Sequence, residues 1–169
     1  MQTYRIRSSF LFPLGLVVVL CLILVGIVIL QQQPAVKLLV VGCALLPLGY
    51  LLFECVVRRI EIDSVGLQMI RLGRVRTFAW NEITAVETVR VRQRAFLTIN
   101  AGEEFLIIAN MYAGFDRLLS NVLERVPAAA ISAETRTLAQ APPVKHSDIV
   151  ILWGLALMMA YLIYAQFPH

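Results

Sequence analysis

The sequence has little charge, and this shortage excludes an ordinary soluble protein. Of its 169 residues, 15% are charged and 59% are hydrophobic, whereas soluble domains average about 25% charged residues. Cysteine is also scarce, and Cys21, Cys43 and Cys55 all lie in apolar runs. Such positions favour small buried side chains over a disulfide framework.

Sequence motifs of common enzyme sites are missing. The chain has no H-E-x-x-H, C-x-x-C or G-x-S-x-G motif and no Gly-rich phosphate loop. A metal site is not predicted, because neither His146 nor His169 lies close to the cysteines in the sequence. Glu103 and Glu104 fall on a predicted turn and are interpreted as solvated charge. We therefore expect no enzymatic activity, no cofactor and no small-molecule substrate.

Three apolar runs stand out instead, each close to the roughly 20 residues that a bilayer requires. Residues 10–30 and 149–167 contain no charged side chain, and residues 38–57 contain only Glu54. The runs predict three transmembrane helices, the last within residues 148–169. The first run is too long for the apolar part of a signal peptide and no small-residue cleavage site follows it, so we expect it to be retained.

Basic residues near the runs predict their orientation. Arg5 and Arg7 precede the first run, Arg58 and Arg59 follow the second, and the short loop between the two runs holds only Lys37. The N-terminus and the segment after residue 57 are therefore predicted to face the cytoplasm. The third run then places the C-terminus outside.

Small residues in the runs predict faces on which another helix can approach closely. Pairs of such residues share a helix face in each run: Gly15 and Gly26, Gly42 and Gly49, and Ala156 and Ala160. Glu54 has two readings, since an ionisable residue inside a span can carry ions or protons. Its position four residues before Arg58 instead favours an ion pair at the membrane interface. We prefer the ion pair, because no second polar residue in a run completes a pathway.

Residues 58–126 form a polar segment with the pattern of short strands followed by one helix. Strands are expected at 58–63, 67–72, 75–80, 83–91, 95–100 and 105–108, and an amphipathic helix at 112–126. The irregular strand 83–91 predicts a bulge near Glu87. The fold class is therefore α+β, a small antiparallel sandwich or barrel of about six to seven strands capped by a helix. Residues 1–57 are assigned to a helical hairpin and residues 127–147 to a linker.

The order of elements in this segment carries a wider pattern. Its parts are Ile60-Glu61-Ile62-Asp63, Gly66-Leu67, a basic hairpin around Gly73, Phe78-Ala79-Trp80-Asn81-Glu82-Ile83, Ala85-Val86, a Gly102 turn and a closing amphipathic helix. Directly after a two-span hairpin, this pattern resembles the bacterial pleckstrin-homology-like (PH-like) membrane proteins, over about residues 11–126. The resemblance implies a bent seven-stranded sandwich, a bacterial inner membrane location and no catalysis. It also implies a role as a scaffold, accessory subunit or assembly factor of a membrane complex, photosynthetic complexes included.

One polar cluster stands above the background, and it is basic. Six arginines flank two predicted turns: Arg71, Arg74, Arg76, Arg90, Arg92 and Arg94. The only acidic residues between positions 71 and 94 are Glu82 and Glu87. The cluster could contact anionic lipid headgroups, at about 1 kcal/mol per charge near the surface, or an acidic partner. It could equally be solvated charge that protects strand edges. Nucleic acid is not an expected partner, because no aromatic residues interleave the arginines.

These features leave three hypotheses for function. The first is a non-enzymatic accessory or assembly subunit of a larger membrane complex, photosynthetic or respiratory, whose PH-like domain braces the cytoplasmic face. The second is a sensor that binds anionic lipid through the six arginines. The third, a self-assembling transporter or channel component, is disfavoured because Glu54 alone could meet an ion within the membrane.

Overall fold

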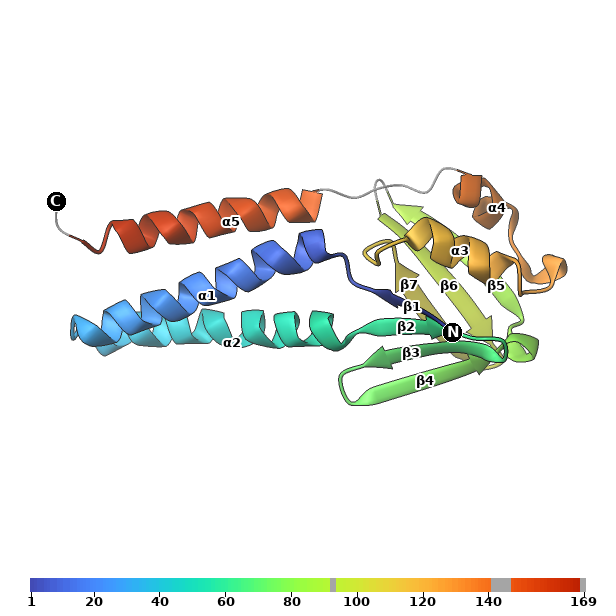
Figure 1. The fold of residues 1–169 in the computed structure, drawn as a ribbon, viewed down its shortest axis with the longest axis horizontal. Coiled ribbons are helices and arrows are strands. Elements are labelled where there is room, and N and C mark those ends of the chain that lie inside the picture. Colours follow the sequence, from blue (N-terminus) through green and yellow to red (C-terminus); the bar gives the residue numbers. More distant parts are fainter. Residues whose placement is uncertain (92–93, 141–146, 168–169) are drawn as a thin grey trace. The chain divides into compact units, whose positions relative to one another are not determined.

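The computed structural model describes residues 1–91, 94–140 and 147–167 (Figure 1). The chain divides into two compact units. The β unit comprises Met1–Arg7 and the described part of Val57–Lys145, and the helical unit comprises Ser8–Val56 and the described part of His146–His169.

The β unit contains two antiparallel sheets, which confirms the α+β class. The first sheet has the order β1-β2-β3-β4 and the second the order β5-β6-β7. Their strands are β1 (Gln2–Arg5), β2 (Arg59–Ile62), β3 (Gly66–Arg71), β4 (Arg74–Ala79), β5 (Ala85–Val91), β6 (Arg94–Ala101) and β7 (Glu104–Ala109). A short 3-10 helix, η1 (Trp80–Glu82), joins the sheets. The predicted strands all exist, with shifts of a few residues at their ends.

Alternate residues of the strands and one face of a helix form the core of this unit. Along β6, Ala95, Leu97 and Ile99 are fully buried, as alternation on a strand requires. The helix α3 (Phe115–Leu123) then buries the face that the sequence predicted: Phe115, Leu118, Leu119 and Val122. Each such side chain contributes about 1.5–3 kcal/mol by leaving water, so α3 is an integral part of the fold.

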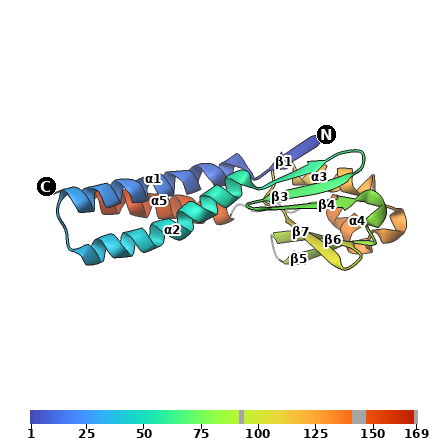
Figure 2. The same ribbon diagram turned by 90° about the horizontal axis from the view of Figure 1, so that it is seen from below.

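The strand β1 was not predicted from the sequence. It pairs with β2 from Gln2↔Ile62 to Arg5↔Arg59 (Figure 2), and its continuation at Ile6 forms a bridge to Tyr112. Tyr4 and Ile6 are buried while Thr3 and Arg5 are exposed. This alternation is a strand signal, in a segment whose Arg5 and Arg7 also predict the orientation of a membrane span.

The predicted bulge near Glu87 is wrong. The register of β5 with β6 runs without a break from Ala85↔Asn100 to Val91↔Arg94. The inward face of β5 carries Val86 and Thr88, so Val89 and Val91 are exposed. The apolar residues of the other parity had suggested a bulge, but they lie on the outer face of the sheet.

The first part of the predicted linker folds onto β5. The 3-10 helix η2 (Ala128–Ala130) leads into α4 (Ala133–Gln140), and the backbone N–H of Ser132 donates to the oxygen of Val86. Thr135 is fully buried, with its hydroxyl 2.9 Å from that of Thr88. This segment therefore belongs to the β unit; the rest of the predicted linker, residues 141–146, lies outside the described residues.

The helical unit contains three helices long and apolar enough to cross a membrane: α1 (Ser8–Leu30), α2 (Ala35–Val57) and α5 (Ser147–Tyr164). The helices α1 and α5 pack through Val17, Cys21, Leu24, Ala156 and Met159. Their starts meet at the rings of Phe12 and Trp153, 6.1 Å apart, and at the far end Gln33 Nε2 donates to Gln166 Oε1. Because both ends match in this way, α1 and α5 run in the same direction.

The helix α2 leaves most of its surface exposed. Among its residues only Cys55 is buried, although Val41, Leu45 and Leu48 pack partly against the α1–α5 contact. Burial of Cys21 and Cys55 agrees with prediction, but Cys43 is exposed on α2. The expectation for Cys43 is therefore wrong among the described residues, because its side chain lies on the exposed surface of α2.

The turn between β2 and β3 predicts a measurable pH dependence. Asp63 Oδ1 accepts hydrogen bonds from the backbone N–H groups of Gly66 and Val65, both 2.8 Å long, and these lower the pKa of Asp63 below its ordinary 3.8. Because the pKa of Asp63 is lower in the folded state than in the unfolded chain, the ionised carboxylate stabilises the fold above pH 3.8. This stabilisation is lost as the pH falls through the folded-state pKa. We expect Asp63→Asn to lose less stability than the wild type between pH 6 and pH 3, measured by urea unfolding. Equal losses in the two proteins would contradict this assignment.

Candidate binding groove at the edges of the two sheets

The β3–β4 hairpin places three arginines on one face. Gly73 has a φ of 68° at the turn, a conformation that glycine adopts without steric cost, and the register pairs Arg71 with Arg74 and Met69 with Arg76. On the same face of the hairpin but farther from the turn, Phe78 is buried in the core. The three arginines therefore extend the inner face of the hairpin beyond the core.

Opposite these arginines lies β7 of the second sheet. A groove of about 260 Å³ lies between the two walls, and Arg76 Nη1 crosses it to donate to the backbone oxygen of Phe105, at 3.3 Å. Arg71 Nε donates to Met69 Sδ at 3.2 Å. The described lining consists of Met69, Arg71, Arg74, Arg76, Phe105, Leu106 and Ile107. We call this hollow the arginine groove.

The charges of the arginine groove are all of one sign. No carboxylate is among its described lining residues, and Arg71 lies directly across from Arg74. Guanidinium groups bind carboxylates or phosphates through paired hydrogen bonds, so the groove suits an anionic ligand.

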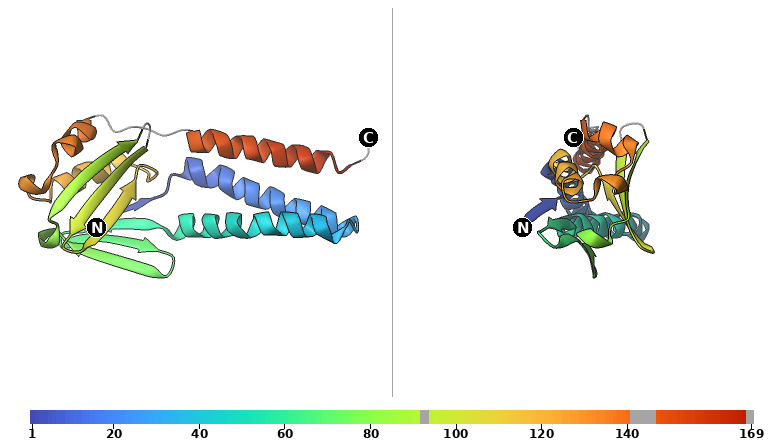
Figure 3. Two further views of the ribbon diagram at one scale, coloured as in Figure 1. Left: turned by 180° about the vertical axis from the view of Figure 1, so that it is seen from behind. Right: turned by 90° about the vertical axis from the view of Figure 1, so that its right-hand side faces the viewer.

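The structure divides the six predicted arginines into separate groups. Arg90 and Arg94 lie beside the β5–β6 turn of the second sheet and do not line the arginine groove. The turn of the β3–β4 hairpin stands apart from the adjoining ends of β5 and β6 in both views (Figure 3). Arg92 lies outside the described residues.

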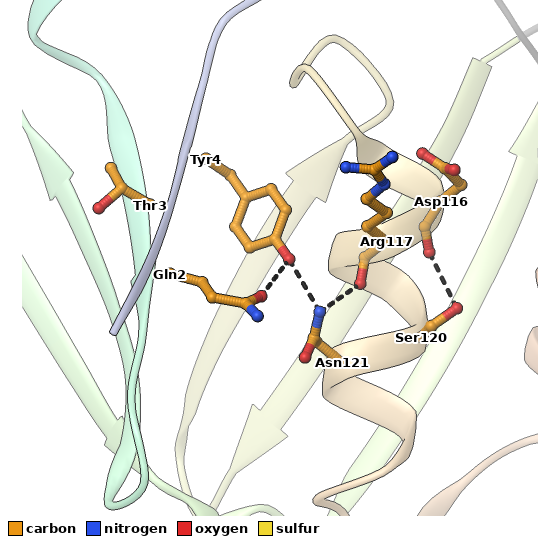
Figure 4. A pocket seen from close by; sticks show the side chains of 7 residues that line it. All are labelled: Gln2, Thr3, Tyr4, Asp116, Arg117, Ser120 and Asn121. Carbon is orange, nitrogen blue, oxygen red and sulfur yellow. Dashed lines mark hydrogen bonds between the residues drawn. The ribbon is translucent and has the colours of Figure 1, made fainter.

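A second hollow lies between β1 and α3, and its polar groups bond to one another (Figure 4). Asn121 Nδ2 donates to Tyr4 Oη at 2.9 Å, and Tyr4 Oη donates to Gln2 Oε1 at 2.8 Å. Its described lining residues also include one acid, Asp116, and one base, Arg117, which balance in charge. This network holds β1 against α3. Because its polar groups bond to one another and its charges balance, it suits a charged ligand less well than the arginine groove does.

The small residues predicted for helix packing have different surroundings. A Cβ added at Gly15, Gly26, Gly42 or Gly49 would meet no atom within 4 Å, so these four positions face open space. Ala156 is buried against α1, whereas Ala160 is exposed. Among the described residues, Ala156 is therefore the one of the six that packs against another helix, and the other five stay predicted contacts for a further helix.

The predicted ion pair of Glu54 and Arg58 lies where α2 ends. Glu54 is in the last turn of α2 and Arg58 follows its final residue, and both side chains are half-buried. Their pairing stays a prediction. Among the described residues, no three His, Cys, Asp or Glu side chains come close enough to hold a metal ion.

Sequence reasoning found the arginines of the groove but missed its other wall. Phe105 and Ile107 are 57% and 43% exposed, and their local sequence predicts only a strand. Nothing in the local pattern of residues 104–109 signals a neighbour near residue 76. Comparison with known proteins adds no relative, because no protein-family model, curated protein or solved structure matches this chain.

Proposed function

We propose that this protein is a non-enzymatic accessory or assembly subunit of a larger membrane protein complex, and that its β unit is a PH-like docking domain. Two antiparallel sheets with a closing helix agree with the architecture that the PH-like resemblance implies. Three apolar helices would provide the anchor. The four glycines beside which an added Cβ meets no described atom, together with the exposed Ala160, would receive helices of the complex.

The observation that carries this proposal is the arginine groove. Three arginines share it with two exposed apolar side chains, Phe105 and Ile107, and arginine with exposed aromatic residues is typical of protein interfaces. A lipid sensor would bind an anionic membrane most strongly if all the arginines lay on one surface. Arg90 and Arg94, however, lie outside the arginine groove. We therefore favour an acidic protein partner over an anionic lipid surface.

The membrane arrangement proposed from the positive charges is supported by two features. The pairing of β1 with β2 requires residues 2–5 and 59–62 on the same side, which two crossings by α1 and α2 satisfy. The parallel direction of α1 and α5 requires that both leave from that side. In this arrangement the β unit is cytoplasmic in a bacterial inner membrane, and the C-terminal end of α5 is outside.

A detergent pull-down of the full-length protein from its native membrane tests this function. We expect a stable set of larger membrane proteins to copurify with the wild type. Replacing both Arg74 and Arg76 by Ser should reduce their recovery by roughly tenfold, since a hydrogen bond to a charged group is worth about 1.5–3 kcal/mol.

Replacing Arg90 and Arg94 by Ser removes the same charge outside the groove and serves as the control, with recovery unchanged. A wild-type protein that is recovered alone would refute the proposed function. Equal losses in both double variants would instead assign the effect to overall charge.

A further inference from the structure

The strand β7 directs one set of backbone groups away from its sheet. The N–H of Asn110 donates to the oxygen of Ala95 at 3.0 Å, and the β6–β7 register continues this pair through Leu97↔Ile108 and Ile99↔Leu106. Alternate residues of an antiparallel strand bond to opposite sides. Phe105, Ile107 and Ala109 therefore point their N–H and C=O groups to the free edge, and the bond from Arg76 to the oxygen of Phe105 agrees with this assignment.

This edge has little of the protection that strand edges need. Among the described residues no strand pairs with β7 on this side. Its sequence, Glu-Phe-Leu-Ile-Ile-Ala, contains no proline or lysine to block a further strand. Arg76 occupies one carbonyl, while the edge groups of Ile107 and Ala109 lie farther along the strand.

The arginines of the facing hairpin are spaced for an extended ligand. Arg74 and Arg76 are two residues apart on β4 and share a face, so their Cα atoms are about 6.6–6.8 Å apart. Alternate side chains of any extended chain repeat at the same distance. Carboxylates on every second residue of such a chain would therefore match the two guanidinium groups in register.

We propose that the free edge of β7 accepts an extended, acidic segment of a partner protein as an additional strand, with Arg71, Arg74 and Arg76 binding its carboxylates. The backbone of Ile107 supplies hydrogen bonds to the segment, and Arg76 exchanges the oxygen of Phe105 for a carboxylate. This inference rests on the proposed docking function and names the chemistry of the partner. Strand addition of this kind obtains affinity from the backbone and specificity from alternate side chains.

A labelled peptide tests the inference on the full-length protein in neutral phosphatidylcholine nanodiscs. The probe is a peptide of about ten residues that alternates Glu and Val, within the usual length of a strand, and the control peptide alternates Lys and Val. By fluorescence anisotropy we expect the acidic peptide to bind roughly tenfold more tightly, or better, since each bond to a charged group contributes strongly. Replacing Arg74 and Arg76 by Ser should remove this preference.

The variant Ile107→Pro separates strand addition from simple anion binding. It removes an N–H that faces the free edge and leaves every β6–β7 bond in place, a position where a sheet tolerates proline. We expect it to weaken binding of the acidic peptide by roughly tenfold. In the wild type, hydrogen exchange at the amides of Ile107 and Ala109 should slow when the peptide binds, a readout that needs no variant.

Binding that survives Ile107→Pro without slowing those amides would overturn strand addition. If phosphatidylglycerol vesicles also displaced that peptide, the groove would be a headgroup site instead. Absence of any preference for the acidic peptide would overturn the inference as well. The pull-down detects the complex independently of the peptide. If the complex were recovered but peptide binding failed these tests, the inference would be wrong and the proposed function would remain supported.

Discussion

Deleting residues 2–6, with α1 kept intact, will leave the β unit without a stable fold. The deletion removes every partner of β2 on one side, the buried side chains of Tyr4 and Ile6, and the bond from the N–H of Ala113 to the oxygen of Arg5. The single substitution Ile6→Ala should already cost about 2–5 kcal/mol. Hydrogen exchange at the amides of β2 in the full-length protein measures both effects.

The matched control is Thr3→Ala, in the same strand but with an exposed side chain. Its effect should stay within about 0.5 kcal/mol, as for most surface substitutions. Protection of the β2 amides that persists after the deletion would show that β1 is dispensable. In that case residues 1–7 would serve only as a charged segment before α1.

Gly66→Ala will be among the most damaging single substitutions in the β unit. A Cβ at Gly66 would lie 2.3 Å from the backbone oxygen of Phe78 and 3.1 Å from the Cα of Ala79. Both atoms belong to β4, so the clash cannot be relieved by a side-chain rotation and β4 must move away from β3. Overpacking usually costs about 1–3 kcal/mol, and we expect the upper end or more, measured by urea unfolding.

Gly73→Ala provides the comparison that isolates this clash. Gly73 has a positive φ, but a Cβ there would meet no atom within 4 Å. Its cost should therefore be only the conformational one, about 1–2 kcal/mol. Equal destabilisation by the two variants would contradict the close approach of β3 and β4 at Gly66.

The local order of elements could be predicted because each short element carries its own periodicity. The alternation of Ile60 and Ile62 and the helical spacing from Phe115 to Val122 correspond to β2 and α3. Strand β5 shows where this reasoning failed, since Val89 and Val91 are exposed although apolar. A hydrophobic pattern finds an apolar face but does not identify which face the core covers.

The candidate site was only half predictable, for a physical reason. Arg71, Arg74 and Arg76 are close in sequence, so the charge cluster is visible without a structure. Phe105 reaches Arg76 only because the two sheets bring the edges of β4 and β7 together, which depends on tertiary packing. The strand β1 was missed for a similar reason, since its partner β2 is separated from it by both α1 and α2.

The position of β1 before the helical hairpin has a consequence for how the protein is made. At roughly 5–20 residues per second, synthesis of residues 6–58 takes about 3–10 seconds, and during this time β1 has no partner. If only one of the two helices entered the membrane, β1 and β2 would be left on opposite sides and the first sheet could not form. In the proposed membrane arrangement, completion of the first sheet therefore requires that both helices cross: a chain in which only one helix crossed would leave β1 unpaired, whereas a chain in which both crossed closes its own sheet.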